Sequence, residues 1–593
     1  MKTVKLLLLA GSCLVSFALP GQKRVPHPFT HRGEAAKEGR LQVLAEVSYP
    51  NTRFLRLFFK GTQLGETSYL LLEAADGAQQ VLRRADLENW KFSSAYFNGS
   101  TVKVSLFAAA GEKNLVNLSE AMITDEEVER NRKARRTAET SAASPRPMLS
   151  TAADITETHP YAKAVGRFTN GIEAAGTGWI APNGAIVTYP GVGSGNYDVT
   201  EYNYDVIEFN VPASVGTTVQ HPAPQDQYPV DLGGKTEGYH KFVFEGEGSV
   251  SQAGWAVLEA LPNETGLRPG ERQQEYFRIA RNPTNHALDD QEDASVDLFH
   301  YGNFNGPVLE GYSNFKNLQL TQTSLQKQNS LLKYDLPYAS DDRDLFVVYF
   351  MNNYSWAHGA PIAYEGSNVA IGVHNGFDQA DPAAVGPGFR SDGFRDGVAR
   401  LFTQKSAYLD WNGVSNQPNG QIDKPYLTVQ QAAQHAPTDY TVYIAKGTYP
   451  GAVTFNRPLT LRAPVGTVKI GANQVVARRA AGSAIPPHWL EDAPSLSFED
   501  QSAEERRVVA SPNPFRDEVT VSYEVSRKGP VSVAVFNGGG AEVARLVSGE
   551  AEAGHHTVRW GGTDRTGTLV APGLYFVRVN TGSQTLTTKV LKQ

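Results

Sequence analysis

The chain has 593 residues, a formal net charge of −7 at pH 7 and 40% hydrophobic residues. This length suits three or four domains of roughly 100–200 residues each, and the apolar content excludes a wholly disordered chain. The small net charge and the lack of an extended basic stretch argue against a nucleic-acid partner.

The N-terminal residues have the pattern of a secretory signal peptide. Residues 1–5 are basic, residues 6–19 are apolar, and Pro20 and Gly21 end the run. We predict that residues 1–21 are removed and that the mature chain has no transmembrane segment. Lipid attachment at Cys13 is an alternative. Cys13 is the only cysteine, so its removal would exclude disulfides, a thiol nucleophile and a cysteine metal site.

The next region predicts a small β-domain followed by a linker. Residues 40–120 contain short runs of alternating apolar and polar residues, such as "FLRLFFKG" and "STVKVSLFAAAG", separated by glycines. Residues 121–153 are acidic, then basic, then rich in Ser, Ala and Pro, which indicates a solvated linker. The pair Arg135 and Arg136 offers the alternative of an exposed processing site.

The remaining chain divides into two β-rich blocks joined by a less regular stretch. Residues 154–407 are rich in predicted strands and turns, which favours a large all-β unit of barrel type. Residues 408–475 contain one short helix, "VQQAAQHA", among short strands, and residues 476–507 read as a second linker. Residues 508–593 alternate strictly over six or seven short strands, the pattern of an immunoglobulin-like sandwich.

The last block resembles a known family. The pieces "SPNPFRDEVTVSYEV", "APGLYFVRV" and "TTKVLKQ", in this order and spacing, are similar to type A C-terminal sorting domains of the type IX secretion system. The residues that carry this resemblance are Pro512, Asn513, Pro514, Phe515, Gly573, Tyr575 and Lys589.

The resemblance implies a Gram-negative bacterium, passage through the periplasm and recognition of the sandwich by the type IX machinery. The protein would then be secreted or held at the cell surface. An ordinary adhesion-type sandwich, which would share the strands but not both end motifs, is the alternative.

The middle block resembles the trypsin-like serine endopeptidases of secreted bacterial proteins. The resemblance is carried by "GTGWIAPNGAIVT" at 176–188, by residues 204–231 and 254–280, and by "AHGAPIAYEGSNVAIGVHNG" at 357–376. It implies a double β-barrel. The β-domain before it and "NRPLTLRAPVGTVKIG" after it, which is similar to a short β-helix, often accompany this protease.

The residues that the resemblance places at the catalytic positions lack catalytic chemistry. The histidine position falls on Gly191, the aspartate position on Gly254 and the serine position on His358, while the oxyanion-hole glycine becomes Trp356. Glycine cannot act as a base or orient one. We therefore predict no catalytic residues in this chain, and a pseudoenzyme that binds a peptide or protein at the former cleft.

Several alternatives remain open at this point. An active serine endopeptidase would need a misplaced triad built from other residues, and a lone histidine is more often hydrogen-bonded or at the surface than a base. A structural surface protein is a further alternative, whereas a polysaccharide enzyme would need a longer β-helix. The acidic stretch 289–300 lacks the ligand spacing of an EF-hand, so no metal or other cofactor is expected. The histidines of the middle block are His159, His221, His240, His300 and His374.

Overall fold

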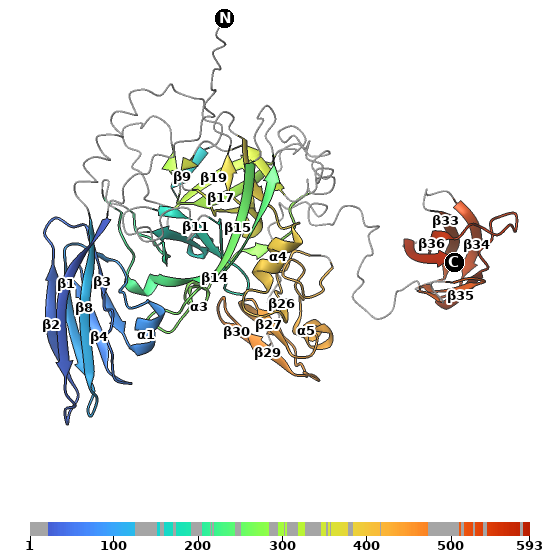
Figure 1. Cartoon of the computed structure of the whole chain (residues 1–593). Coiled ribbons are helices and arrows are strands. Elements are labelled where there is room, and N and C mark those ends of the chain that lie inside the picture. The colour runs from blue at the N-terminus through green and yellow to red at the C-terminus, as the bar shows by residue number, and fades with distance from the viewer. Residues whose placement is uncertain are drawn as a thin grey trace, which may run out of the picture. The chain divides into compact units, whose positions relative to one another are not determined.

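The computed structural model divides into two compact units, residues 1–493 and 494–593, which are treated separately below. It describes residues 22–124, 151–154, 159–169, 174–190, 204–213, 215, 219–242, 251–283, 295–301, 303–304, 318–325, 346–350, 354–355, 357–377, 383–415, 417–472, 509–511, 515–525, 528–537, 542–581 and 585–592. The prediction of a mostly β protein is confirmed (Figure 1).

The N-terminal domain is a sandwich of two four-stranded sheets. One sheet has the order β1 (Gln22–Gly33), β8 (Asn114–Thr124), β3 (Phe54–Phe58) and β6 (Phe97–Asn98). The other has the order β2 (Arg40–Ser48), β7 (Thr101–Ala108), β4 (Tyr69–Ala74) and β5 (Gln79–Leu82), followed by helix α1 (Arg84–Asn89). Alternate residues of β4 are buried, as the period of two requires. The sandwich begins at Gln22, well before residue 40, and its last strand runs four residues past residue 120.

The next six strands form a closed barrel. Its order is β10 (Val165–Thr169), β11 (Ala174–Ile180), β12 (Ile186–Thr188), β15 (Ser251–Ala260), β14 (Gln227–Phe242) and β13 (Val206–Glu208). The predicted hairpin is present, because β11 pairs with β12 in antiparallel fashion. Its turn uses Gly184 at φ +83°, a conformation that favours glycine. Short helical turns η1 (Ala162–Ala164), η2 (Pro224–Asp226) and α3 (Pro269–Gln273) lie outside these strands.

The second half of this block is a six-stranded sheet joined to a three-stranded one. The larger sheet has the order β16 (Arg278–Ile279), β23 (Val369–Val373), β22 (Pro361–Tyr364), β17 (Ser295–His300), β19 (Gln319–Ser324) and β9 (Thr151–Asp154). The smaller has the order β20 (Phe346–Phe350), β25 (Ala383–Pro387) and β24 (Gly376–Phe377). Bridges between Leu325 and Tyr349 and between Gly372 and Gly388 connect the two. A further pair, β18 (Asn303–Phe304) with β21 (Tyr354–Ser355), and helix α4 (Asp392–Ala399) complete the block.

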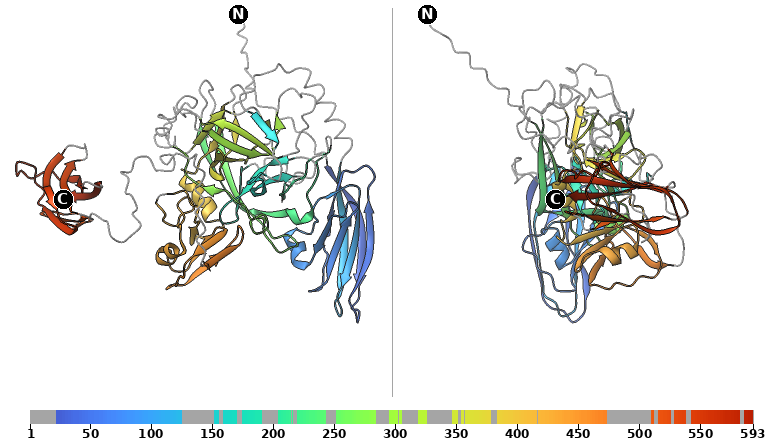
Figure 2. Two further views of the ribbon diagram at one scale, coloured as in Figure 1. Left: turned by 180° about the vertical axis from the view of Figure 1, so that it is seen from behind. Right: turned by 90° about the vertical axis from the view of Figure 1, so that its right-hand side faces the viewer.

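All the described strand pairs of the following segment are parallel, whereas the strands before it are antiparallel except for the pair β16 and β23. Strands β26 (Ser406–Leu409), β27 (Tyr440–Ile444) and β29 (Leu459–Arg462) form one parallel ladder, and β28 (Gly447–Pro450) with β30 (Val468–Ala472) forms another. Helix α5 (Val429–His435) begins where the sequence predicted it, with Thr428 as its N-cap. Figures 1 and 2 show this segment against one side of the barrel and the N-terminal sandwich against another.

The C-terminal unit is a seven-stranded sandwich with its own core. Strands β31 (Val509–Ser511), β32 (Val519–Val525) and β35 (Gly554–Trp560) form one sheet. Strands β34 (Glu542–Ala551), β33 (Gly529–Asn537), β36 (Gly573–Asn580) and β37 (Thr585–Lys592) form the other. Alternating residues such as Val519, Val521, Val533 and Val577 fill the space between the sheets, as expected for a sandwich.

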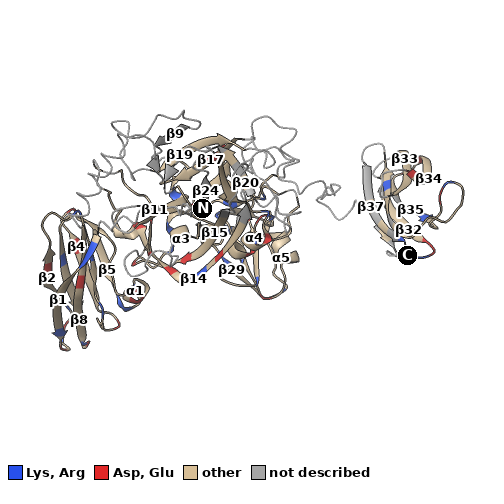
Figure 3. Ribbon diagram, turned by 45° about the horizontal axis from the view of Figure 1, so that its top comes forward, with Lys and Arg blue, Asp and Glu red and all other residues tan. Residues whose placement is uncertain are grey.

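Basic and acidic positions are interspersed along the described strands and helices of both units (Figure 3). This mixed distribution agrees with the small net charge and with the absence of a basic stripe in the sequence. Within the same described residues, no helix is both long enough and apolar enough to cross a bilayer.

Candidate functional site

The main chain of the loop that carries His358 is hydrogen-bonded to the closed barrel. The His358 carbonyl accepts a hydrogen bond from the Thr177 N–H at 2.8 Å. The next residue, Gly359, has φ +88°, and a Cβ there would overlap the Thr177 carbonyl. The hydroxyl of Thr188 donates a hydrogen bond to the same Thr177 carbonyl at 2.7 Å. The position of His358 is therefore fixed by close backbone packing that only glycine at 359 permits.

The His358 side chain lies between two other rings. Its centroid is 5.1 Å from that of Tyr189, and 5.6 Å from that of His374, with 6° between the two imidazole planes. Burial lowers the pKa of His358 to about 4, against a smaller opposing effect of the Asn375 backbone. A pKa this low makes the imidazole a weak base, so it would take a proton from a hydroxyl less readily than a histidine whose pKa lies near the working pH.

His374 is the buried partner in this pair. Its Nδ1 lies 2.5 Å from the Tyr349 hydroxyl, and burial lowers its pKa well below the usual value, with His358 and His300 adding to the effect. Burial also raises the pKa of Tyr349 well above 10.0. Two neutral groups therefore meet here, and the direction of their hydrogen bond depends on the tautomer of His374. The other ring nitrogen of His374, Nε2, has no hydrogen-bond partner among the described residues.

Gly254, which the sequence predicts at the aspartate position, lies where an added side chain would overlap its neighbours. A Cβ would come within 2.5 Å of Pro190 Cγ and within 2.8 Å of the Tyr239 ring. The Gly254 N–H donates to Asn375 Oδ1 at 2.7 Å. A proline ring and a tyrosine ring therefore occupy the space next to Gly254 that a side chain at this position would enter.

The structure brings together only part of the predicted site. His358 and Gly254 are linked indirectly. His358 stacks on His374, and the next residue, Asn375, accepts a hydrogen bond from the Gly254 N–H. Gly191 and Trp356 lie outside the described residues. Tyr349 and Tyr189 were not singled out in the sequence analysis. In the sequence, only their positions near the predicted catalytic segments indicate that these two tyrosines belong to the candidate site.

The other histidines of the block have structural partners. Glu208 bonds His221 Nδ1 at 2.6 Å and Arg167 at 2.6 Å, all three being buried. His300 Nε2 lies 2.8 Å from the Thr321 hydroxyl, and His159 packs edge-on against Tyr161. Each therefore has the hydrogen-bonding or packing role that is more common for a lone histidine than catalysis.

One serine and histidine pair lies outside the predicted positions. His240 Nε2 is 3.1 Å from Ser391 Oγ. Ser391 is buried and caps helix α4, since its Oγ accepts the Phe394 N–H at 3.2 Å. An N-cap hydroxyl is held in place by the helix that it caps. Ser391 is therefore best explained as the N-cap of α4, with His240 as its hydrogen-bond partner. Substitutions of these two residues test whether they act as a misplaced catalytic pair.

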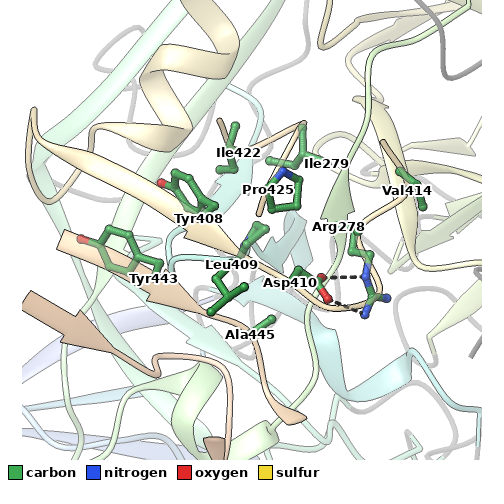
Figure 4. A pocket seen from close by; sticks show the side chains of 12 residues that line it. Arg278, Ile279, Tyr408, Leu409, Asp410, Val414, Ile422, Pro425, Tyr443 and Ala445 are labelled. Carbon is green, nitrogen blue, oxygen red and sulfur yellow. Dashed lines mark hydrogen bonds and ion pairs between the residues drawn. The ribbon is translucent and has the colours of Figure 1, made fainter. Parts of the chain in front are cut away.

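The cavity in Figure 4 lies between strand β16 of the six-stranded sheet and the parallel strands β26 and β27. Tyr408, Tyr443, Ile422 and Pro425 line it beside the ion pair of Arg278 with Asp410. Its volume for a water-sized probe is about 10 Å³, roughly the space of one water molecule. It is too small for a substrate. Within the described ranges, His, Asp and Glu side chains form no cluster suited to a metal ion.

The described residues of the predicted sorting motif lie towards the two ends of the C-terminal sandwich sequence. Phe515 is buried beside Trp560 and bridges to Lys592. Gly573 begins β36, Tyr575 is buried within it, and Lys589 lies in the paired strand β37. Residues 512–514 fall outside the described residues.

Comparison with known protein families gives one match, in the C-terminal unit. Residues 515–585 match the family described as FlgD Ig-like domain. No curated protein matches the chain.

Three solved structures are among those to which the chain is similar. PorZ, a bacterial surface component of the type-IX secretion system of Porphyromonas gingivalis, is 22% identical over 14% of this chain and 11% of its own, with a TM-score of 0.12. FlgD from P. aeruginosa is 23% identical over 15% of this chain and 78% of its own, with a TM-score of 0.12. A Glu endopeptidase in complex with MPD is 16% identical over 40% of this chain and 90% of its own, with a TM-score of 0.26.

Proposed function

We propose that this protein is a secreted pseudoenzyme with a serine-protease-like scaffold that acts by binding. The observation that carries the proposal is the packing around Gly254, where Pro190 and Tyr239 occupy the space that a catalytic aspartate would need. The substitution is thus accompanied by neighbours that exclude the lost residue.

The surroundings of His358 support the same conclusion. A serine protease needs a nucleophile, a base that takes its proton and a carboxylate that orients the base. The described residues that pack on or bond to His358 include the rings of Tyr189 and His374 and the backbones of Thr177 and Asn375. An imidazole at that position, uncharged and held between rings, has the properties of a packing element.

The expected ligand is a peptide or a protein, bound at the former cleft. Tyr239 supports this role, since its side chain is 50% exposed beside Gly254. Exposed aromatic side chains next to a rigid scaffold are common anchors in protein recognition.

The C-terminal sandwich is proposed to serve as the export signal of the type IX route. Its match to the FlgD Ig-like family and the sequence motifs at its two ends support this role. The protein would pass through the periplasm and then be released or kept at the cell surface.

An activity assay tests the pseudoenzyme proposal. Purified protein lacking residues 1–21 is incubated with casein and a peptide library, and separately with a fluorophosphonate that labels activated serines. We expect neither turnover nor labelling. The Ser391→Ala and His240→Ala variants are the controls. Turnover that either substitution abolishes would establish an active hydrolase and end the proposal.

A secretion assay tests the export signal separately. The full chain and a chain ending at residue 507 are produced in a Gram-negative host that has type IX secretion. The full chain should reach the surface or medium, and the shortened chain should accumulate in the periplasm. Export of both chains to the same extent would contradict the assignment.

A further inference from the structure

The N-terminal sandwich meets the barrel through an ion pair that is shielded from water. Arg56, in β3, donates from Nη1 to Asp205 Oδ1 at 2.7 Å and from Nη2 to Asp205 Oδ2 at 3.0 Å. The side chains are 2% and 16% exposed, respectively. Two parallel bonds of this kind are a strong and geometrically demanding form of ion pair.

The ion pair is one end of a longer buried network. Arg56 also donates to the Tyr96 hydroxyl at 3.2 Å, and the Tyr96 ring stacks on His221 with 4.9 Å between centroids and 15° between planes. His221 in turn bonds Glu208. Burial opposes ionisation of Glu208, yet its pKa is lowered, because His221 and Arg167 stabilise the charged carboxylate.

Main-chain groups on both sides are paired by side-chain amides. Asn98 donates to the His221 carbonyl and accepts the His221 N–H, both at 2.9 Å. Gln227 accepts the Tyr96 N–H at 2.9 Å and donates to the Tyr96 carbonyl at 2.8 Å. Each amide thereby satisfies a donor and an acceptor of the opposite domain, as buried polar groups require.

Apolar packing continues across the same boundary. Val206, in barrel strand β13, is fully buried and belongs to the hydrophobic core of the N-terminal sandwich. Phe54 of the sandwich packs edge-on against His221 with 5.8 Å between centroids. The sandwich core is therefore completed by a residue of the barrel.

We propose that the N-terminal sandwich is a permanently docked part of the functional protein, held by the Arg56–Asp205 contact, and not a segment that leaves when the linker is cut. Separation would leave Arg56 without its carboxylate and would expose Val206. The contact combines a doubly bonded, water-shielded ion pair with paired amides and shared apolar packing, and separation of the domains would break all three at once.

The experiment cuts the linker and asks whether the domains part. A recognition sequence for a specific protease is inserted within residues 125–150 of the full chain, and the cut protein is followed by gel filtration and native mass spectrometry at successive dilutions. We expect residues 22–124 to stay bound to the remainder. Separation of the cut wild-type protein at the same dilution as the Arg56→Met variant would overturn the proposal.

Two variants and a control locate the contact. Arg56→Met and Asp205→Asn should each raise the dissociation constant of the cut protein at least about 100-fold, the size expected for breaking a buried ion pair. Lys103→Met removes the more exposed pair with Glu73 in the same sandwich and should change it less than about 5-fold.

Asp205→Asn leaves the sequence of the sandwich unchanged, so it remains informative if Arg56→Met does not fold. An unchanged dissociation constant in the folded variants would show that the ion pair does not hold the domains together.

Discussion

The imidazoles of His358 and His374 stack face to face, 5.6 Å between centroids and 6° from parallel. Two ionised rings in this arrangement would repel each other, and burial disfavours a single charge as well. The pair is therefore stable as two neutral rings, with Tyr349 bonded to the inner one. Acid should thus weaken this part of the fold.

The first prediction concerns the pH dependence of stability. An unfolded histidine titrates near 6.5, whereas the pKa of His358 in the folded protein is about 4. Between these values the unfolded chain binds a proton that the folded one does not, so the free energy of unfolding falls as the pH falls from 6.5 towards 4. His358→Gln removes this contribution and should reduce the fall by at most about 3 kcal/mol. Urea unfolding at several pH values measures the free energy of unfolding of both proteins. The same change with pH in the wild-type protein and in the His358→Gln variant would refute the prediction.

The second prediction tests the packing at Gly254. Gly254→Ala places a Cβ against Pro190 and Tyr239, and we expect the free energy of unfolding to drop by roughly 1–3 kcal/mol, as for other overpacked sites. Gly254→Asp should be at least as destabilised and should remain inactive on casein. Gly393→Ala is the control, because the nearest atom to its added Cβ is 3.9 Å away. It should stabilise helix α4 by up to about 1 kcal/mol. A fully stable Gly254→Asp protein would refute the packing argument.

The third prediction concerns a buried carboxyl beside the N-terminal sandwich. Burial raises the pKa of Glu264 to about 7, with Asp86 of α1 adding to the rise and Arg272 and Gln80 opposing it. The backbone N–H of Glu264 also opposes the rise, and burial outweighs all the opposing effects. Because the folded pKa lies above the unfolded value of 4.5, stability present below pH 4.5 is lost as the pH rises through 7.

Glu264→Gln removes this loss. The variant should exceed the wild-type protein by up to about 3 kcal/mol at pH 8, with the advantage shrinking as the pH falls towards 4.5. Thermal unfolding across that range measures the difference. A constant difference at all pH values would show that the carboxyl does not titrate in this window.

The sequence predicted those features that depend on local pattern. The hairpin of β11 and β12 follows from alternation and a glycine turn, and helix α5 follows from its capping residue Thr428. By contrast, β1 begins at Gln22 although it contains Pro26 and Pro28, which weaken any strand prediction. The structure tolerates them because β1 lies at the edge of its sheet and its register shifts at Pro26.

The interior of the candidate site depended on contacts that no local pattern reveals. Tyr349 and His374 lie 25 residues apart, and Arg56 and Asp205 lie 149 apart. The family resemblance predicts where catalytic groups would lie, so Gly254 and His358 could be named as candidate positions from the sequence. Which side chains pack around these two residues depends on how distant strands pair and pack. It became clear only from the folded chain.

The fourth prediction compares a buried with an exposed ion pair. Asp410 bonds Arg278 at 2.7 Å and accepts from the Tyr276 hydroxyl at 2.6 Å, joining the parallel strands to the barrel block. Asp410→Asn should destabilise the protein by about 3–5 kcal/mol, because Arg278 keeps its charge. Asp396→Asn, which breaks the exposed pair with Arg400, should cost less than about 0.5 kcal/mol. Equal costs in urea unfolding would contradict this account.

The fifth prediction separates the C-terminal sandwich from the rest of the chain. Phe515 is buried against Trp560, with 5.4 Å between ring centroids, and Phe515→Ala should destabilise this sandwich by about 3–5 kcal/mol. For a domain of this size that corresponds to a fall of more than about 10 °C in its midpoint.

Because the sandwich is a separate compact unit with its own core, the transition of residues 1–493 should not move. Calorimetry of the full chain resolves the two transitions, and Leu569→Ala is the control, since that side chain is 70% exposed. If export depends on the folded sandwich, Phe515→Ala should reduce secretion while Leu569→Ala does not. A secreted Phe515→Ala protein with an unfolded sandwich would show that the machinery reads the sequence of the motif and not its fold.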